Sequence, residues 1–466
     1  MSEQSESLYA SHIKIYPKYQ QGFFRKIKWI SLFILLGFYY LIPLIRWDRG
    51  GDLPTQAVLF DLPHRKFYIF DLVIWPQDIF LLTFLLIVSA VGLFFITALA
   101  GRVFCGYMCF QTVWTDLFLY VENFFEGSPR QRRMLDEHKF TGKWFVRKAG
   151  KHFVWLLIGL ATGGAFVFYF ADAPTLFKSF LDGSAPYAAW FSLGFLTITT
   201  YVFAGFAREQ VCIYMCPYAR FQGAMFDADT LIVAYDEKRG EPRESNKKIR
   251  GKENSGDCID CHECVRVCPT GIDIRDGQQY QCITCAACID ACDEVMDHIG
   301  KPHGLVRYTA LSALENKKAR LFRPRVLFYG GILLLAVLMI IVHLASRASV
   351  DLNVIRHRKP VYITQSDGSI QNNFTIRVLN MTAKPQVYAL GIEGLKNAEL
   401  SVAAMTQKDD DGNTLLIVGP GKVEPFTAYV RSKDRSGGQS AITFALTAQD
   451  ETGGQDRYES VFMRPE

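Results

Sequence analysis

The sequence has none of the short motifs that nucleotide-binding or hydrolytic proteins usually carry. It contains no P-loop and no pattern typical of a catalytic triad, and the two glycines of "GRVFCG" do not have the spacing of a dinucleotide-binding fingerprint. It also lacks a large charge of one sign, since the formal net charge is +5 over 466 residues. A charge this small does not indicate a nucleic-acid partner. Nucleotide chemistry, hydrolysis and nucleic-acid binding are therefore poorly supported.

The amino-terminal stretch shows no sign of a secretory signal. Residues 1–28 have no early apolar core and no small-residue cleavage site, and such a signal needs both. We therefore expect the first hydrophobic run to stay in the chain as an anchor.

What the sequence does have is hydrophobic residues collected into long runs. Half of all residues are hydrophobic, 14% are aromatic, and the mean hydropathy is +0.09. Five runs approach or reach the roughly 20 residues that a membrane-spanning helix needs; they lie at 29–45, 79–100, 153–171, 187–206 and 326–345. Buried helices of a large soluble protein are the alternative, but five such runs with charged flanks are hard to explain that way. The composition predicts five spans, and Pro43 leaves the limits of the first one open.

Lysine and arginine are unevenly distributed between the segments that connect these runs. The segments on one side of the predicted membrane carry many basic residues. These are Lys14, Lys18, Arg25, Lys26 and Lys28 before the first run, and Arg102, Arg130, Arg132, Arg133, Lys139, Lys143, Arg147, Lys148 and Lys151 after the second. The other side carries Arg46, Arg49, Arg65, Lys66 and Lys178. Because basic residues collect on the cytoplasmic side, we expect the amino terminus and residues 208–325 to lie inside. Five crossings then place the carboxyl terminus outside.

The last part of the chain differs from the rest because it contains no cysteine from residue 349 onward. Short alternating stretches such as "NFTIRVLN" and "PFTAYVRS" lie between the turn signals "SDGS", "DDDGN" and "SGG", a pattern that predicts a β-sandwich. We therefore divide the chain into a cytoplasmic tail (1–28), a membrane domain with four spans (29–207), a cytoplasmic cysteine-rich domain (208–325), a fifth span (326–345) and a periplasmic β-sandwich (346–466).

Eight of the twelve cysteines lie between residues 258 and 292. Cys258, Cys261, Cys264 and Cys268 have the spacing C-x2-C-x2-C-x3-C-P, and Cys282, Cys285, Cys288 and Cys292 repeat it without the proline. In ferredoxins with two [4Fe–4S] clusters, the fourth cysteine of each run binds the other cluster. We therefore predict one cluster on Cys258, Cys261, Cys264 and Cys292, and a second on Cys268, Cys282, Cys285 and Cys288. Zinc and disulfides are the alternatives. A zinc site would not need the third closely spaced cysteine of each run, and disulfides are disfavoured in a reducing cytoplasm.

The other four cysteines follow hydrophobic runs in two matching motifs. "GRVFCGYMCFQ" contains Cys105 and Cys109, and "REQVCIYMCPY" contains Cys212 and Cys216, so both read C-x-Y-M-C. On a continuing helix the members of each pair would share one face. Thiolates, with the thioethers of Met108 and Met215, suit Cu(I). A third cluster, a disulfide/dithiol couple, or simple packing between helices are the alternatives.

The sequence resembles the FixG/CcoG family of cytochrome c oxidase accessory proteins, which includes proteins named RdxA, over nearly its whole length. The most specific pieces are "QAVLFDLPHRKFYIFDLVIWPQD", "GYMCFQTVWTDLF", "LIVAYDEKRGEPR" and "CPTGIDIRDG". The family's membrane motifs read C-x-x-x-C-P. This chain keeps Pro217 but has Phe110 where the first proline belongs, so the backbone of the first motif need not match that of the second.

This resemblance implies a bacterial inner-membrane iron–sulfur protein with an immunoglobulin-like carboxyl-terminal domain. It also implies a role in assembling the cbb-type oxidase, in which a cytoplasmic donor reduces the clusters and Cu(II) near Cys105, Cys109, Cys212 and Cys216 is reduced to Cu(I). Oxidase assembly factors or copper chaperones would be the partners. The alternatives are a quinol-linked electron-transfer subunit resembling NapH-type ferredoxins, and a non-enzymatic assembly scaffold.

Overall fold

The computed structural model describes residues 14–50, 53–138, 142–243, 255–395, 397–434, 438–450 and 454–465. The tail before residue 14, Lys139 and most of the "SGG" turn signal lie outside these ranges. Contacts within the chain define two compact units. The first unit comprises Met1–Leu44 and Gln77–Ile340, and the second comprises Ile45–Pro76 and Ile341–Glu466.

Among the residues that the structure describes, five helices of the first unit are long and apolar enough to cross a membrane. They are α1 (Phe23–Leu41, continued by the 3-10 turn η1, Ile42–Leu44), α2 (Ile79–Ala100), α6 (Gly142–Phe168), α8 (Tyr187–Val202, continued by the π-helix η3, Phe203–Ala207) and α14 (Pro324–Ala345). The number of spans is as expected, and α2 has the predicted limits. Helices α1 and α6 begin six and eleven residues before the hydrophobic runs that predicted them, because tertiary contacts pair the polar groups of these added segments.

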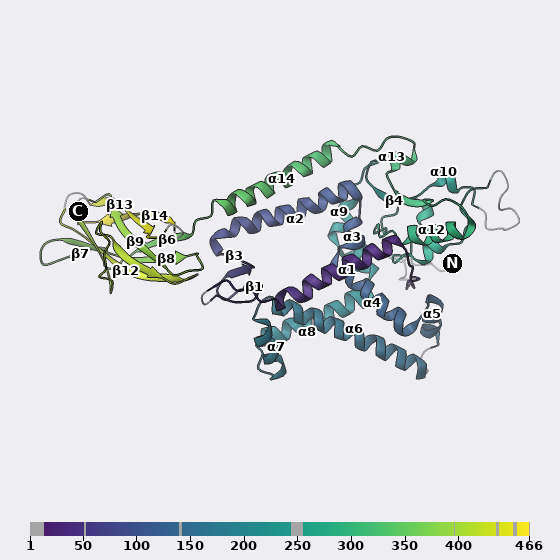
Figure 1. Cartoon of the computed structure of the whole chain (residues 1–466), viewed down its shortest axis with the longest axis horizontal. Helices are drawn as coiled ribbons and strands as arrows, with labels where there is room; N and C mark the ends of the chain where they lie inside the picture. The colour runs from purple at the N-terminus through teal and green to yellow at the C-terminus, as the bar shows by residue number, and fades with distance from the viewer. Residues whose placement is uncertain are drawn as a thin grey trace, which may run out of the picture. The chain divides into compact units, whose positions relative to one another are not determined.

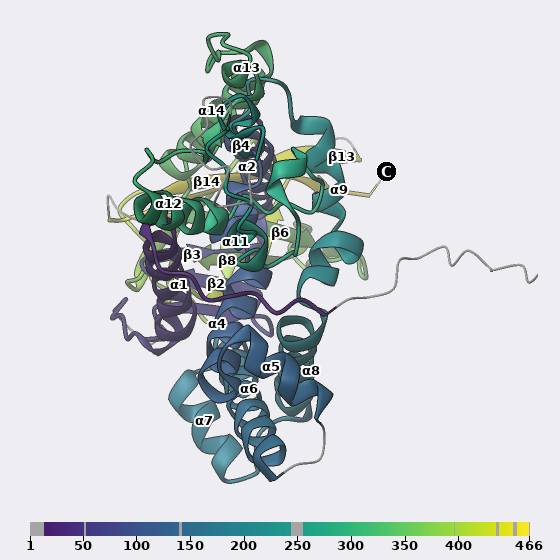
Figure 2. The ribbon, with the colours of Figure 1, turned by 90° about the vertical axis from the view of Figure 1, so that its right-hand side faces the viewer.

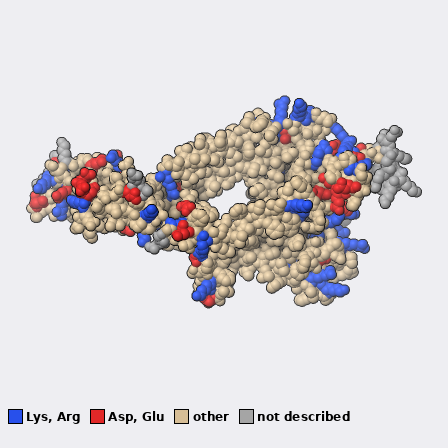
Figure 3. All heavy atoms as spheres, viewed as in Figure 1, with Lys and Arg blue, Asp and Glu red and all other residues tan. Residues whose placement is uncertain are grey.

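Shorter elements connect these helices. They are the 3-10 turn η2 (Pro76–Asp78), α3 (Val103–Tyr107), α4 (Phe110–Glu126), α5 (Pro129–Glu137), α7 (Ala173–Leu181), the π-helix η4 (Val211–Met215) and α9 (Pro217–Met225). In Figure 3 the surface over α2 and α14 carries almost no charged side chains, whereas Lys and Arg gather where α14 begins. This distribution is typical of helices that span a membrane and have basic residues at the end that leaves it.

The start of α6 lies against buried acidic groups of α4. Glu122 and Glu126 are fully buried, and Glu122 pairs with Arg208. The Glu126 carboxylate lies 2.9 Å from Lys148 Nζ and 2.7 Å from Lys151 Nζ. Because buried charges persist only when they are paired, these contacts explain why helix α6 extends into the polar segment before its hydrophobic run.

The cysteine-rich region folds as a small ferredoxin domain at one end of the helices. Its elements are β4 (Ile232–Tyr235), α10 (Glu237–Gly240), α11 (Glu263–Arg266), the 3-10 turn η5 (Ile274–Asp276), α12 (Ala287–Ile299), β5 (Val306–Thr309) and α13 (Leu311–Leu314). Strands β4 and β5 pair antiparallel. Figure 2 shows α11, α12 and β4 at the end of the first unit that faces the viewer, with α1 beside α12.

The ferredoxin domain is tied to the ends of three spanning helices. The Asp290 carboxylate of α12 accepts hydrogen bonds from the backbone N–H groups of Phe24 and Arg25 at 3.1 and 2.8 Å. It therefore satisfies donors that the start of α1 leaves free. At the end of α2, the Ala98 carbonyl accepts hydrogen bonds from Thr230 and from Arg323, which immediately precedes α14. Helices α1 and α14 thus begin, and α2 ends, at the ferredoxin domain (Figure 1).

The second unit contains a β-sandwich, as the alternating sequence predicts. One sheet has the order β10-β12-β8-β6, with β7 also paired to β8, and the other has the order β11-β9-β13-β14. The strands are β6 (Val350–Arg356), β7 (Ile363–Thr364), β8 (Ile370–Asn380), β9 (Gln386–Glu393), β10 (Ala398–Val402), β11 (Thr414–Val418), β12 (Val423–Ser432), β13 (Gln439–Ala448) and β14 (Gln455–Met463). Phe374 and Phe444 meet edge to face in a fully buried core, which is the packing expected between two sheets.

The same unit includes the segment that follows the first span. Residues 45–76 form an antiparallel meander of β1 (Val58–Asp61), β2 (Lys66–Ile69) and β3 (Leu72–Ile74). Lys66 Nζ donates to the Gly421 carbonyl at 2.8 Å, and Arg347 donates to the Val73 carbonyl. A segment that the sequence division assigns to the membrane domain therefore makes its contacts with the carboxyl-terminal β-domain.

Candidate functional site

The two cysteine runs of the ferredoxin domain have the same local backbone. Asp260 and His262, on either side of Cys261, have φ values of 52° and 58°, and Thr284 and Ala286, on either side of Cys285, have 57° and 60°. Residues other than glycine rarely adopt this left-handed conformation, and they are found there mainly where function requires it. Both runs therefore fold into the same strained loop around their second cysteine.

One set of thiols forms around Cys264. Burial raises the pKa of Cys264 to about 12, with Cys261 and Cys258 contributing in the same direction. The pKa of Cys292 is also raised to about 12, by burial and then by Cys264 and Cys261 among its neighbours. The set thus joins three cysteines of the first run to the fourth cysteine of the second.

The other set joins Cys268 to the second run. Burial raises the pKa of Cys282 to about 12, and Cys285 and Cys268 raise it further. Burial also raises the pKa of Cys288, with contributions from Cys285, Cys268, Cys282 and, from the other set, Cys264. The two sets therefore lie close to one another, and the assignment of ligands to clusters stays a prediction.

The donors of both sets have the chemistry that iron–sulfur clusters require. All eight cysteines are free thiols, and burial keeps Cys264, Cys282, Cys288 and Cys292 protonated. Bound iron would replace those protons and hold the thiolates. Arg275, which is 5% exposed and ion-paired with Asp260 and Asp273, partly offsets the rise that burial causes in the pKa of Cys264. His262 lies at the surface, with Nδ1 2.8 Å from an Arg275 nitrogen.

Neither membrane motif lies on one continuing helix, which is the condition under which its two cysteines would share a face. Helix α2 ends at Ala100, Cys105 lies in the short helix α3, and Cys109 is the extended residue that precedes α4. Likewise Cys212 lies in the π-helix η4 and Cys216 is the extended residue that precedes α9. The chain therefore turns between the two cysteines of each pair.

The missing proline of the first motif does not change its backbone. Cys109 has φ −63° and ψ 129°, and Cys216 has φ −77° and ψ 111°. Phe110 begins α4 as Pro217 begins α9. Proline at a first helical position is favoured because its φ suits the helix and its missing N–H is not needed there, but other residues can take the same conformation. The two motifs are therefore equivalent at this position.

The two motifs bring their four thiols together, although they are more than 100 residues apart in sequence. Burial raises the pKa of Cys212 to about 12, and Cys109, Cys105 and Cys216 each raise it further. Cys105 is in turn influenced by Cys109 and Cys216. By contrast, the side chains of Met108 and Met215 are 51% and 56% exposed. We refer to Cys105, Cys109, Cys212 and Cys216 as the four-thiol set.

Two buried polar residues lie beside the four-thiol set. Gln222 of α9 is 1% exposed and donates from Nε2 to Cys105 Sγ at 3.3 Å. Arg102, which is 4% exposed, donates to the Ala219 carbonyl of α9 and to the Tyr280 carbonyl of the ferredoxin domain, both at 2.6 Å. Arg102 thus links the first membrane motif, the second membrane motif and the loop that carries Cys282 and Cys285.

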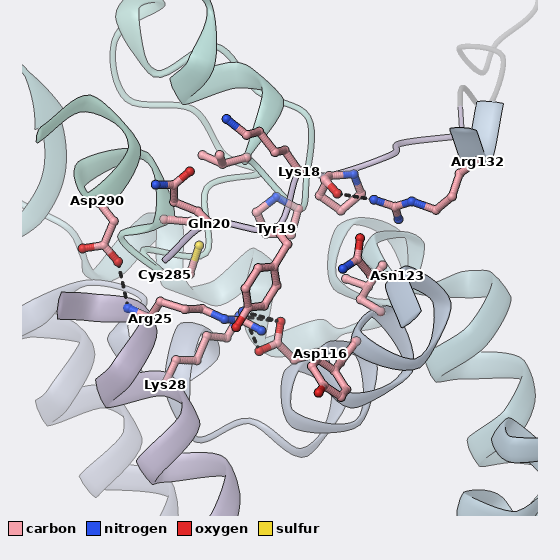
Figure 4. A pocket seen from close by; sticks show the side chains of 16 residues that line it. Lys18, Tyr19, Gln20, Arg25, Lys28, Asp116, Asn123, Arg132, Cys285 and Asp290 are labelled. Carbon is pink, nitrogen blue, oxygen red and sulfur yellow. Dashed lines mark hydrogen bonds and ion pairs between the residues drawn. The ribbon is translucent and has the colours of Figure 1, made fainter. Parts of the chain in front are cut away.

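The first motif also packs directly on that loop. A Cβ atom at Gly106 would lie 2.8 Å from the Ile283 carbonyl oxygen and 3.0 Å from Cys285 Cα, so only glycine fits without displacement. Tyr107 donates from its hydroxyl to the Cys285 carbonyl at 3.2 Å. Figure 4 shows Cys285 beside a neighbouring cavity between the start of α1, α4 and the ferredoxin domain, near Asp290, Arg25, Lys28 and Asp116.

Sequence reasoning missed Arg102, Gly106, Asp290 and Gln222. One signal was present, because the residue between cysteine and tyrosine is glycine in the first motif and Ile213 in the second. That difference marks the motif that touches the ferredoxin loop. Nothing local distinguishes Asp290 or Gln222 from ordinary helix residues.

Comparison with known proteins agrees with the assignment of the two ferredoxin runs, and it also includes the first membrane motif. Residues 207–311 match the model of the 4Fe-4S dicluster domain, residues 82–127 match the 4Fe-4S binding domain, and residues 340–465 match the IG-like fold at the C-terminal of FixG. "Nitrogen fixation protein FixG" of Rhizobium meliloti is 43% identical over 98% of this chain and 94% of its own length. The chain belongs to the FixG family.

Two further relatives give the same result. "Protein RdxA" and "Protein RdxB" of Cereibacter sphaeroides are 47% and 48% identical to this FixG-family chain, over 84% and 86% of each sequence. A crystal structure of a FixG-related protein from Vibrio parahaemolyticus covers 25% of the chain and 98% of its own, with 22% identity and a TM-score of 0.22. The chain is thus a membrane-associated iron–sulfur electron-transfer protein with an immunoglobulin-like carboxyl-terminal domain.

Proposed function

We propose that this chain carries electrons from its ferredoxin domain to the four-thiol set and there reduces Cu(II) to Cu(I). The observation that carries the proposal is the contact of Gly106 with the backbone of Ile283 and Cys285. It places the first membrane motif directly against a loop that holds two predicted cluster ligands. The two [4Fe–4S] clusters, when bound, supply one-electron carriers.

Copper suits this site because its donors are soft. Thiolate and thioether sulfur favour Cu(I) over Cu(II), so binding near the four-thiol set would assist the one-electron reduction. The exposed side chains of Met108 and Met215 are accessible to an arriving copper ion and to a copper chaperone. In line with the resemblance, we propose that the Cu(I) is used in assembling a cbb-type cytochrome c oxidase, with a cytoplasmic protein as electron donor.

Copper reduction is tested by mixing the anaerobic, dithionite-reduced protein with Cu(II) and following Cu(I) with a chromogenic chelator. Cys212→Ser should lower the rate at least about tenfold, because even the loss of a group that only supports a metal ligand weakens such a site by about that factor. Met215→Ala should have a smaller effect. Met134→Ala, a similarly exposed methionine on α5, is the control and should leave the rate unchanged. Full activity in Cys212→Ser would contradict the proposal.

Quinol-linked electron transfer is a second candidate, favoured by one cavity of the first unit. Trp144, His152 and Phe206 line this cavity at the polar ends of α6 and α8, and so does Arg208, close to Cys212 in sequence. Aromatic walls and an imidazole near the membrane boundary suit a quinol ring. Reduction of the clusters by a short-chain quinol, with no Cu(II) reduction, would select this function.

We also propose that the ferredoxin domain is cytoplasmic and the β-sandwich periplasmic, in a bacterial inner membrane. The basic loops support this orientation, as does an odd number of spans with α14 beginning beside the ferredoxin domain. Alkaline phosphatase fused after residue 466 should be active, and a fusion near residue 252 should be inactive. The meander at 45–76 should be accessible from the same side as the β-sandwich. The reverse pattern of activities would overturn the orientation.

A further inference from the structure

The chain has more cysteines than two clusters can use, and the surplus is four. Eight of its twelve cysteines belong to the ferredoxin runs, which leaves Cys105, Cys109, Cys212 and Cys216. The match to the 4Fe-4S binding domain at 82–127 contains only Cys105 and Cys109. Since a [4Fe–4S] cluster usually takes four cysteine ligands, this segment cannot complete one alone. The two cysteines not otherwise assigned, Cys212 and Cys216, come from the equivalent second motif.

The four thiols also come together in the way that the thiols of the ferredoxin domain do. Each of the four lies close enough to act electrostatically on the other three, as in the set formed by Cys268, Cys282, Cys285 and Cys288. The four-thiol set therefore resembles the ferredoxin sets in that it joins four cysteines from two separate motifs.

We propose that the four-thiol set ligates a third [4Fe–4S] cluster, shared between the two membrane motifs. This inference deepens the proposed function, because it assigns a resident electron carrier to the place where Cu(II) is reduced. One electron from a reduced ferredoxin cluster would enter the third cluster and leave to Cu(II), giving Cu(I), with no bond made or broken and no proton transferred. Copper is then a substrate that binds on the exposed side of the motifs, near Met108 and Met215, and is not itself held by the four thiols.

The residues around the four-thiol set are suited to a cluster that exchanges electrons, because they contact a ligand sulfur and reach the ferredoxin loop. Gln222 donates to Cys105 Sγ from a buried position, and hydrogen bonds to ligand sulfur raise a cluster's reduction potential. The other polar atom of its side chain, Oε1, is buried and has no hydrogen-bond partner among the described residues. Because its Nε2 contacts the sulfur of Cys105, Gln222 is a positioning residue that acts through Cys105. Arg102 and Gly106 join this environment to the loop of Cys282 and Cys285.

The deciding measurement is the iron and acid-labile sulfide content of the whole protein, purified anaerobically. Three clusters predict about twelve iron atoms and twelve sulfides per chain, against about eight of each for two clusters. Cys105→Ser and Cys212→Ser should each lose about four of both, and the double variant no more than either single variant. The wild-type count decides even if a variant fails to fold, because about eight irons in fully loaded wild-type protein overturns the proposal.

Gln222→Leu provides a second and independent test. The variant should keep about twelve irons while the reduction potential of one cluster becomes more negative, as followed by redox titration with EPR detection. Gln222→Glu should also keep the iron. Loss of iron in Gln222→Leu, or unchanged potentials of all clusters, would contradict the positioning role and the assignment of Cys105 as a cluster ligand.

Failure of this inference can be distinguished from failure of the proposed function. About eight irons with one copper ion that is lost in Cys212→Ser would overturn the third cluster and leave Cu(II) reduction intact, with copper on the thiols. About twelve irons with no reduction of Cu(II) would support the cluster and overturn copper as the substrate.

Discussion

Cys268→Ala is expected to destroy the cluster bound by the second cysteine run while sparing the cluster bound by its own run. The reason is that Cys268 neighbours Cys285, whereas Cys264 neighbours Cys261 and Cys258. Removing one of four thiolates from a cubane usually prevents its stable assembly. The protein should lose about four irons and four sulfides per chain.

Double variants identify which cluster is lost. Cys268→Ala combined with Cys285→Ala should lose no more iron than either change alone, because both residues serve one cluster. Cys268→Ala combined with Cys261→Ala should lose about eight irons, because the residues serve different clusters. Iron and sulfide analysis of anaerobic preparations checks both, and the opposite pattern of additivity would show that each run binds its own cluster.

Gly106→Val is expected to slow electron transfer to the membrane motifs by about tenfold or more without removing any cluster. The new Cβ would lie 2.8 Å from the Ile283 carbonyl oxygen, closer than real Cβ atoms are found, and 3.0 Å from Cys285 Cα, which is also tight. Helix α3 would have to move away from the ferredoxin loop, and displacements of about 1 Å can cost up to 10²-fold in rate. Cu(II) reduction by the pre-reduced protein, followed by stopped-flow spectroscopy, measures the effect.

The control for this change is Gly223→Val on α9, where a Cβ would meet nothing within 4 Å. It introduces the same β-branched residue next to Gln222 but has room for it, so the rate should stay near that of the wild type. Both variants should keep their iron. An unchanged rate in Gly106→Val would show that the contact between motif and loop does not limit electron transfer.

The spans, the cluster spacing and the sandwich could be predicted because each depends on local sequence. Helix α2 has the limits of its hydrophobic run, since a span needs only enough consecutive apolar residues. The ferredoxin runs are recognisable because their loops are short enough for spacing alone to constrain the thiols. Alternation along strands such as β8 and β12 reflects a two-residue period that any half-buried strand obeys.

The limits of other helices followed tertiary contacts instead. Helix α1 begins at Phe23 because Asp290, more than 260 residues later, accepts the hydrogen bonds of its first turn. Helix α6 includes Lys148 and Lys151 ahead of its hydrophobic run because Glu126 neutralises them. A hydropathy pattern treats these polar turns as the end of the helix, since their partners are distant in sequence.

The sequence by itself determined the twelve thiols, their grouping into two dense runs and two matching motifs, and the apolar runs that surround them. Only the tertiary structure decided that each membrane motif turns between its cysteines, that the two motifs meet, and that Gly106 lies against the loop of Cys285. The physical reason is one of range. Spacing constrains atoms within a few residues of one another, whereas the meeting of Cys105 with Cys216, and of Gly106 with Cys285, depends on how separate helices pack.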